Sequence, residues 1–467
     1  MNLEESLIGF ADTLCFNDLP EAVVDAVKRM TMNTFAAMIA GSANDSVLRL
    51  NRLVRSWNGR PESTVFLQPG KVPCVEAVFV NAAMARAMDF DDFHMQTGMH
   101  ASASLIPVAL AVAEQSGSID GKAFITAVAL GAEILCRMRA VPDQCIGVSG
   151  WTGEIFGAFG GALTAAKLLG LKPEETGGAL GLAYAQASGN SQSIYDGSAA
   201  TFLQQGFSAK AGVMSALMAA AGLSGAKRFL TGRAGLYPVY YRQMAYDTDR
   251  LLQGLKERYE FLNIATKPYP SCGFTMAPIE NVVGLIKTHS LSVEDVEQIT
   301  VFVNKKMHAT VCAPADRKFK PEVPADALFS MPYVIATGVL KGDVKLEDFT
   351  REAISEPKRL KFMNRIRIVE DENMEKEALV TQLFLGTHSI RIDCTDGRRF
   401  ERKMQYSSGF PQKPLSLDQC AAKAKKVVSA AARPLPETKI DAMQEAVENL
   451  EKLRTLKPLI NLMPGSD

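Results

Sequence analysis

From the N-terminus to about Pro268, the sequence consists of one Ala- and Gly-rich apolar segment after another, and this pattern constrains the fold more than any other feature. Each segment is apolar at helical spacing or nearly all round, which is typical of buried helices. Small side chains also let neighbouring helices approach closely. The pattern therefore predicts a large helical core, with helices over residues 20–39, 121–138, 155–169, 174–187 and 207–221.

The pattern changes after Pro268. Residues 298–303 alternate between polar and apolar side chains, as a strand does, and residues 366–369 form another β-like stretch. Asp396-Gly397 lies between two further strand-like stretches, and this dipeptide is a strong signal for a hairpin turn. A helix is expected over residues 330–340, and the chain becomes helical again after Leu415. This part of the sequence predicts an α+β unit followed by a helical tail.

Composition excludes several classes of protein. Lys and Arg number 51, as do Asp and Glu, so the chain lacks the basic balance of a nucleic-acid binder. Eight cysteines without a C-x-x-C pair do not indicate a zinc ribbon, an iron–sulfur cluster or a disulfide framework, and scattered thiols fit a reducing cytosol. The acidic N-terminus does not look like a signal peptide, and no apolar run approaches the roughly 18 residues of a membrane span. We expect a cytoplasmic protein with no membrane or nucleic-acid partner.

The densest polar cluster combines three carboxylates and two imidazoles, from Asp89, Asp91, Asp92, His94 and His100. Apolar helical sequence precedes and follows it, so the cluster is expected on a loop at the mouth of a pocket. Three interpretations remain open: a metal site, an Asp that orients a His acting as general base, or a structural loop.

Three other motifs carry candidate functional residues. Lys267 opens a proline-rich stretch and offers a fixed cation for a substrate carboxylate, although a hinge is the commoner explanation. Residues 150–157 are Gly-rich but lack the spacing of a nucleotide-binding loop. Tyr333 follows a Pro near an expected helix start, where it serves either as a phenol donor or as core packing.

Five collinear segments resemble the MmgE/PrpD family. They read AMDFDDFH with a later His, GEIFGAFGGALTAAKLLGL, GFSAKAGVMSALMA, KPYPSCGFTMAPIE and FSMPYVIATGVLKGDV, and they span about residues 80–345. The resemblance implies a mainly α fold, with a large all-helical domain over residues 1–266 and 411–467 and a smaller α+β lid domain over residues 267–410. It also implies a homodimer, no organic cofactor and a small carboxylate as substrate. We expect no metal.

The resemblance also implies which residues form the site. The expected catalytic residues are Asp91, His100, Lys267 and Tyr333. Thr97 lies on the same loop as Asp91 and His100, and Cys272 falls where members carry a Cys or a His. The expected substrate-binding residues are Thr97, Thr152, Thr201, Gln204 and Cys272.

This chain departs from the family pattern at three positions. Thr152 and Met276 stand where members frequently have a His, and Thr201 stands where they commonly have a Lys. Losing one charge-assisted hydrogen bond to a carboxylate costs about 1.5–3 kcal/mol, so a substrate with fewer carboxylates than a tricarboxylate fits better. We expect a cofactor-independent lyase, of dehydratase or decarboxylase type, that moves a proton next to a carboxylate of a small di- or tricarboxylic acid. The alternatives are an epimerase or isomerase and a non-catalytic carboxylate-binding paralogue.

Overall fold

The computed structural model describes residues 2–142, 150–242, 244–381 and 387–464. The chain divides into two compact units. The helical unit comprises Met1–Ala87, Asp91–Ile264 and Leu415–Asp467, and the mixed unit comprises Met88–Phe90 and Ala265–Pro414. The predicted mainly α fold with a smaller mixed region is confirmed.

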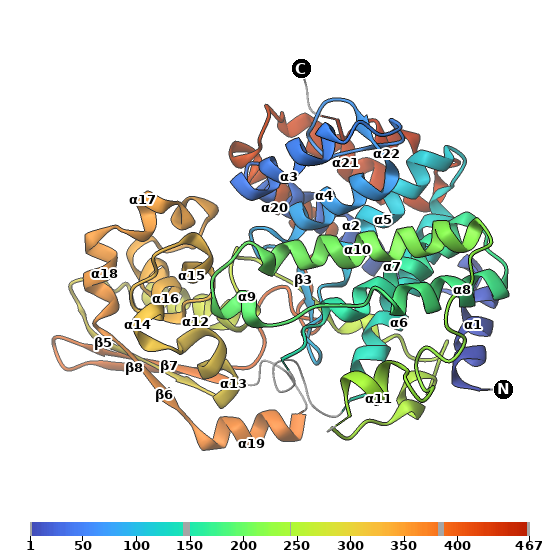
Figure 1. Ribbon diagram of the computed structural model, residues 1–467. Helices are drawn as coiled ribbons and strands as arrows, with labels where there is room; N and C mark the ends of the chain where they lie inside the picture. Colours follow the sequence, from blue (N-terminus) through green and yellow to red (C-terminus); the bar gives the residue numbers. More distant parts are fainter. Residues whose placement is uncertain (1, 143–149, 243, 382–386, 465–467) are drawn as a thin grey trace. The chain divides into compact units, whose positions relative to one another are not determined.

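The helical unit contains the long helices of the chain (Figure 1). Short strands β1 (Ser63–Thr64), β2 (Lys71–Val72) and β3 (Asp92–His94) interrupt them. The helices are α1 (Leu3–Thr13), α2 (Glu21–Gly41), α3 (Asp45–Ser56), α4 (Cys74–Arg86), α5 (Ala101–Ser116), α6 (Gly121–Ala140), α7 (Glu154–Leu169), α8 (Pro173–Tyr184), α9 (Gln192–Tyr195), α10 (Ala200–Ala220), α11 (Leu236–Tyr240), α20 (Leu417–Lys425), α21 (Glu437–Glu448) and α22 (Lys457–Ile460).

Helix α7 lies at the centre of this unit, where it packs against α5, α6, α8 and α10 (Figure 1). Gly212 of α10 explains how closely two helices approach, because a Cβ at this position would lie 2.7 Å from the carbonyl oxygen of Ala158 in α7. The C-terminal segment belongs to the same unit: α20 packs against α2, and Lys423 Nζ donates to Asn33 Oδ1 at 2.6 Å. The helical unit is thus built from both ends of the chain.

Helix α10 begins at Ala200, seven residues before the predicted helix over residues 207–221. The predicted helix over residues 207–221 leaves Gly206 outside it, but this glycine lies inside α10. A Cβ on Gly206 would lie 2.7 Å from the carbonyl oxygen of Phe79, so close packing against α4 explains the glycine better than a turn does. Thr201 and Gln204 therefore lie in the first turns of a long helix.

The mixed unit is organised around a four-stranded sheet with the order β6-β5-β7-β8 (Figure 1). Strand β5 (Val296–Val303) runs parallel to β6 (Ile366–Glu370) and antiparallel to β7 (His388–Cys394), which forms a hairpin with β8 (Arg399–Met404). All four strands coincide with predicted stretches, and Gly397 in the turn has a φ of 85°, which glycine adopts without strain. Strand β4 (Ile264–Thr266) lies where the two units meet in the sequence.

Helices α12 and α16 contact the sheet of the mixed unit and each other. The predicted helix over residues 330–340 is α16, and Ser330 caps it by accepting a hydrogen bond from the backbone N–H of Tyr333. The helices of this unit are α12 (Met276–Thr288), α13 (Lys305–Met307), α14 (Ala315–Lys318), α15 (Pro324–Leu328), α16 (Met331–Lys341), α17 (Arg351–Ile354), α18 (Pro357–Met363) and α19 (Glu372–Thr381).

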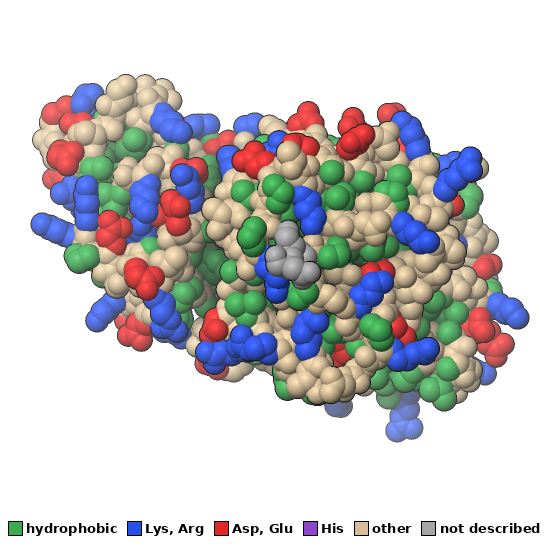
Figure 2. Space-filling model, turned by 90° about the horizontal axis from the view of Figure 1, so that it is seen from above, with side chains coloured by type: hydrophobic (Ala, Val, Ile, Leu, Met, Phe, Trp, Pro, Cys, Tyr) green, Lys and Arg blue, Asp and Glu red, His purple; other side chains and the backbone are tan. Residues whose placement is uncertain are grey.

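Surface charge follows the balanced composition. On the face shown in Figure 2, Lys and Arg side chains alternate with Asp and Glu side chains. No helix of the described residues combines the length and the hydropathy needed to cross a lipid bilayer.

The contact between α7 and α10 predicts opposite effects of the same substitution at two glycines. Gly212→Ala forces a Cβ against the α7 backbone and should lower the free energy of unfolding by about 1–3 kcal/mol. In Gly9→Ala, in α1, the added Cβ meets no atom within 4 Å. This substitution should raise the free energy of unfolding by about 0.5–1 kcal/mol, because alanine loses less conformational entropy than glycine when a helix forms. Thermal unfolding of both variants measures this, and equal melting temperatures would contradict the close contact.

Candidate functional site

The polar cluster of the sequence lies between α4 and α5, and its carboxylates are all buried. Asp89 has a φ of 49° and Gly98 a φ of 67°, so the backbone turns sharply at both ends of the cluster. His100 is the residue directly before α5. Within the helical unit, this loop brings the side chains of Asp91 and His100 together.

Asp91 and His100, both predicted as catalytic, are in direct contact within the helical unit. The Nδ1 atom of His100 lies 2.9 Å from Asp91 Oδ2 and 2.6 Å from the carbonyl oxygen of Asp92. Because the carbonyl oxygen of Asp92 accepts a hydrogen bond from Nδ1, the ring proton lies there and Nε2 is left as a proton acceptor. The imidazole keeps 16% of its surface exposed, whereas Asp91 is fully buried. Arg86 Nη1, 3.7 Å from Asp91 Oδ1, adds a positive charge that favours the ionised carboxylate.

Asp92 is the second buried carboxyl group beside this pair. Its Oδ1 accepts a hydrogen bond from the backbone N–H of Ser102 at 3.3 Å. Burial, followed by the negative charge of Asp91, raises the pKa of Asp92 to about 6. Asp92 therefore holds its proton more tightly than an ordinary aspartate does.

His94 and Thr97 bind each other. The Nδ1 atom of His94 lies 2.8 Å from Thr97 Oγ1, and its Nε2 lies 3.0 Å from the carbonyl oxygen of Glu260. Burial lowers the pKa of His94 to about 4, so its ring stays neutral. The Thr97 hydroxyl, predicted to bind substrate, is thus used to orient a structural histidine, and this contact favours a structural role for both residues.

Gln205, which the sequence did not single out as a site residue, fixes the backbone of His100. Its Nε2 donates to the carbonyl oxygen of His100 at 2.9 Å and lies 2.5 Å from Ser104 Oγ. The only feature of the sequence that could have indicated Gln205 is its position directly after Gln204. A glutamine inside an apolar helix has no feature that distinguishes it before the packing of α10 on α5 is known.

The neighbouring Gln204 instead holds the loop that precedes α10. Its Nε2 donates to the carbonyl oxygen of Asn190 at 3.1 Å and to Ser193 Oγ at 3.0 Å. Thr152 lies against the same loop, because its N–H donates to the carbonyl oxygen of Gly189 at 3.3 Å. The buried Oγ1 of Thr152 has no hydrogen-bond partner among the described residues. Thr201 is half-buried in the first turn of α10.

Lys267 belongs to the mixed unit and pairs there with Asp89. Its Nζ lies 2.8 Å from Asp89 Oδ1 and 3.1 Å from the carbonyl oxygen of the same residue. Both side chains are almost fully buried. A buried ammonium needs such a partner, and the pair fixes the position of the cation. Asp89 was part of the polar cluster in the sequence, but nothing in the sequence identified it as the partner of a residue 178 positions away.

Cys272 and Tyr333 lie in the mixed unit as well, and neither is poised for proton transfer. Burial raises the pKa of the Cys272 thiol to about 11. The Tyr333 hydroxyl donates to the carbonyl oxygen of Asp348 and accepts from the guanidinium of Arg359, whose carbon lies 4.8 Å from the centre of the tyrosine ring. Burial raises the pKa of Tyr333 to about 12. These contacts favour a structural role for Tyr333.

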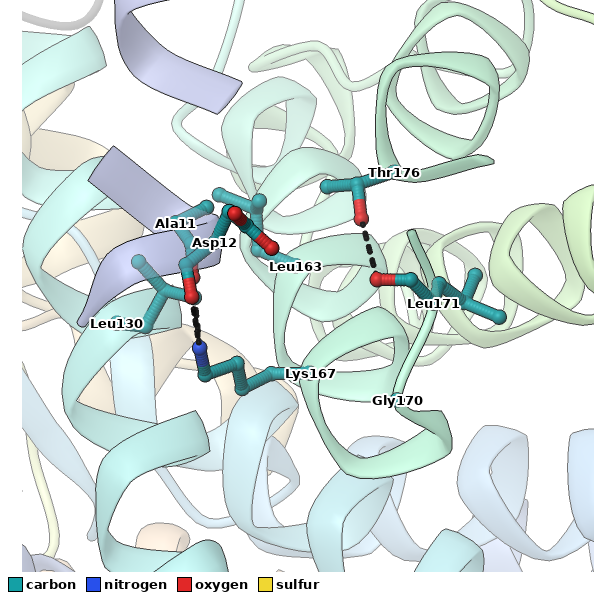
Figure 3. Close-up of a pocket in the computed structure, with 8 residues that line it drawn as sticks. All are labelled: Ala11, Asp12, Leu130, Leu163, Lys167, Gly170, Leu171 and Thr176. Carbon is teal, nitrogen blue, oxygen red and sulfur yellow. Dashed lines mark hydrogen bonds between the residues drawn. The ribbon is translucent and has the colours of Figure 1, made fainter. Parts of the chain in front are cut away.

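A cavity of about 190 Å³ lies elsewhere in the helical unit, between α1, α6, α7 and α8 (Figure 3). Lys167 Nζ donates there to the carbonyl oxygens of Ala11 and Asp12 at 2.8 and 3.0 Å, at the C-terminal end of α1. A cation at the negative end of a helix dipole stabilises the helix, which accounts for this lysine without a ligand. Within the described parts of the chain, no three His, Cys, Asp or Glu side chains are grouped so as to hold a metal ion.

The pKa of Asp92 predicts how stability depends on pH. In the folded protein Asp92 binds its proton up to about pH 6, whereas an ordinary aspartate releases it near pH 3.8, so folding becomes less favourable as the pH rises through this window. The penalty is about 3 kcal/mol at neutral pH. Asp92→Asn should therefore unfold at a higher temperature than the wild type at pH 7.5, with the difference vanishing at pH 4.

Asp295→Asn serves as the control of opposite sign, because hydrogen bonds from Ser292 lower the pKa of Asp295. Melting curves of both variants between pH 4 and pH 8 measure the effect. A gap between Asp92→Asn and wild type that does not change with pH would contradict the raised pKa.

Comparison with known proteins identifies the family. The MmgE/PrpD N-terminal domain matches residues 5–249, and the MmgE/PrpD C-terminal domain matches residues 269–451. Cis-aconitate decarboxylase of Aspergillus terreus is 22% identical over 97% of this chain and 94% of its own length. The enzymes of that name from Mus musculus and Homo sapiens are 23% and 24% identical over 99% of this chain, and over 94% and 95% of their own lengths. These relatives support an enzyme of lyase or dehydratase type, and the chain belongs to the MmgE/PrpD family.

Proposed function

We propose that this protein is a cofactor-independent lyase that acts on a small di- or tricarboxylic acid. His100 removes a proton from the carbon next to a substrate carboxylate, and Asp91 holds the imidazole in the tautomer that accepts it. The observation that carries this proposal is the position of His100 Nδ1, which lies 2.9 Å from Asp91 Oδ2 and is hydrogen-bonded to the carbonyl oxygen of Asp92 at 2.6 Å, so that Nε2 is left as the proton acceptor. General-base catalysis by such a histidine contributes about 10²–10⁴-fold to a rate.

The bond changes of the proposed reaction balance in two ways. In a dehydration, Nε2 takes the proton, the electron pair passes into the adjacent carboxylate, and its return expels a β-hydroxyl group that leaves as water after it receives a proton. In a decarboxylation, His100 starts with a proton from solvent on Nε2. Carbon dioxide leaves, its bonding electrons pass through a double bond into the neighbouring carboxylate, and His100 then gives its proton to carbon and takes another from solvent. Both routes build negative charge on a carboxylate, and a fixed cation stabilises that charge.

We assign the role of this cation to Lys267. Asp89, which binds Lys267, and Asp91, which binds His100, are two positions apart. Membership of the MmgE/PrpD family supports the assignment of both groups to one reaction. Thr152, Thr201, Gln204 and Cys272 remain proposed substrate-binding residues, and the unsatisfied Thr152 hydroxyl supports the first of them.

We also propose that the enzyme is a cytoplasmic homodimer. Each described cysteine is a free thiol, and six of these seven thiols are buried. Free thiols of this kind are typical of proteins that stay in a reducing compartment. The homodimer rests on membership of the family alone.

Exchange of substrate protons with D₂O tests the role of His100. The wild type should exchange a proton next to a carboxylate in at least one member of a panel of C4–C6 hydroxy and unsaturated acids, and His100→Ala should lower that rate about 10²–10⁴-fold. Asp91→Asn should cause a comparable loss, because an amide favours the wrong tautomer. NMR of the products distinguishes elimination from epimerisation.

The matched control is His308→Ala, since His308 Nδ1 lies 2.9 Å from Glu370 Oε1 in a half-exposed pair of the mixed unit. This variant should exchange protons at the wild-type rate. Absence of exchange in the wild type across the whole panel would refute the proposed function and favour a carboxylate-binding paralogue. Equal rates for His100→Ala and the wild type would refute the role of His100.

A pair of variants separates the catalytic role of Lys267 from its structural role. Lys267→Met leaves the Asp89 carboxylate buried without its ammonium and should lower the free energy of unfolding by about 3–5 kcal/mol. Adding Asp89→Asn removes that charge and should restore most of the stability. The double variant should nevertheless remain impaired in proton exchange. If it recovers wild-type exchange together with stability, Lys267 is only structural.

A further inference from the structure

His94, the last residue of β3, is fully buried in the helical unit and uses both nitrogens of its ring. Its Nε2 lies 3.0 Å from the carbonyl oxygen of Glu260, which can only accept, so the ring proton lies on Nε2. Nδ1 is therefore an acceptor, and both the hydroxyl and the backbone N–H of Thr97 donate to it, at 2.8 and 3.3 Å. These contacts fix the ring in one neutral tautomer, which agrees with the low pKa of His94.

The backbone of His94 closes the turn that ends at His100. The N–H of His94 donates to the carbonyl oxygen of Met99 at 2.7 Å, and its own carbonyl oxygen accepts from the N–H of Gly98 at 2.7 Å. Thr97, Gly98 and Met99 are the three residues directly before His100, and each of them is hydrogen-bonded to His94. The position of the His100 backbone therefore depends on His94.

The segment on the other side of the His94 ring is itself held by α6. Glu133 Oε2 accepts from the backbone N–H of Phe261, the residue directly after Glu260, at 3.2 Å. Arg137, one turn further along α6, pairs with Glu133, and both side chains are buried. The Arg137 guanidinium also donates to four carbonyl oxygens of the preceding chain, those of Leu251, Gln253, Gly254 and Arg258. The Glu260 carbonyl oxygen is thus a fixed point to which the His94 ring is attached.

We propose that His94 is a positioning residue for the general base His100. Its imidazole joins the turn that ends at His100 to the segment that α6 holds, so the His100 ring keeps its place beside Asp91. This inference rests on the proposed function, because it assigns His94 a part in placing the proposed base. The Thr97 hydroxyl then acts through His94 and does not bind substrate.

Kinetics of proton exchange separate this indirect role of Thr97 from direct binding. Thr97→Val removes the hydroxyl with little change of shape. It should lower the exchange rate at saturating substrate about 10–100-fold and change KM less than about threefold, because a displaced base slows proton transfer without loosening the bound carboxylate. Thr97→Ser keeps the hydroxyl and should retain the wild-type rate. The matched control is Thr126→Val, because Thr126 is a buried threonine whose hydroxyl donates to the carbonyl oxygen of Lys122 within α6 at 2.8 Å.

Nitrogen NMR of labelled histidine side chains gives a second readout that needs no turnover. In the wild type, we expect the proton of His94 on Nε2 and that of His100 on Nδ1, with the signals of His100 assigned by their loss in His100→Ala. In Thr97→Val, and in His94→Asn, whose shorter side chain gives up the outer hydrogen bond, the His100 ring should shift towards the Nε2-protonated tautomer, because its Nδ1 loses a fixed acceptor. Thr126→Val should leave both rings unchanged.

Three results would overturn the proposal. A higher KM with an unchanged saturating rate in Thr97→Val would show that this hydroxyl binds substrate. Wild-type kinetics in Thr97→Val, or an unchanged His100 tautomer in both Thr97→Val and His94→Asn, would show that His94 does not place His100. If the wild type exchanges no proton, only the proposed function fails, and the NMR comparison still decides whether His94 positions His100.

Discussion

Burial of three carboxylates within four residues, at Asp89, Asp91 and Asp92, is the constraint on which the proposed chemistry depends. A carboxylate loses its hydration on burial and must receive an opposite charge, hydrogen bonds or a proton in return. Each aspartate meets this requirement differently. Asp89 pairs with the Lys267 ammonium, Asp91 contacts His100 and Arg86, and Asp92 holds a proton more tightly than an ordinary aspartate.

Because their partners differ, the three aspartates have different roles in the proposed site. The Asp91 carboxylate lies beside the His100 imidazole, and the hydrogen bond between Nδ1 and the carbonyl oxygen of Asp92 leaves Nε2 for proton transfer. The carboxylate beside the lysine fixes a cation instead. Thr97, predicted to bind substrate, and Tyr333, predicted as catalytic, complete the hydrogen bonds of buried neighbours, and those contacts explain their presence without assigning them a chemical step.

Two lysines of the helical unit show how a cation can serve stability alone. The Lys167 ammonium binds two carbonyl oxygens at the end of α1, and the Lys423 ammonium binds Asn33. These contacts account for both lysines without a ligand.

The sequence alone determined the mainly α fold, the four strands of the mixed unit and the family, because these depend on local periodicity, turn residues and collinear motifs. It also identified Asp91 and His100 as candidate site residues, because they lie only nine positions apart in one polar cluster. Tertiary structure decided the contacts that join distant parts of the chain. These are Asp89 with Lys267, Gln205 with the His100 carbonyl oxygen, and Gly206 with Phe79. A side chain's partner across a hundred or more residues depends on how helices and loops pack. That packing also decides whether a buried polar group is satisfied by the protein or left for a ligand.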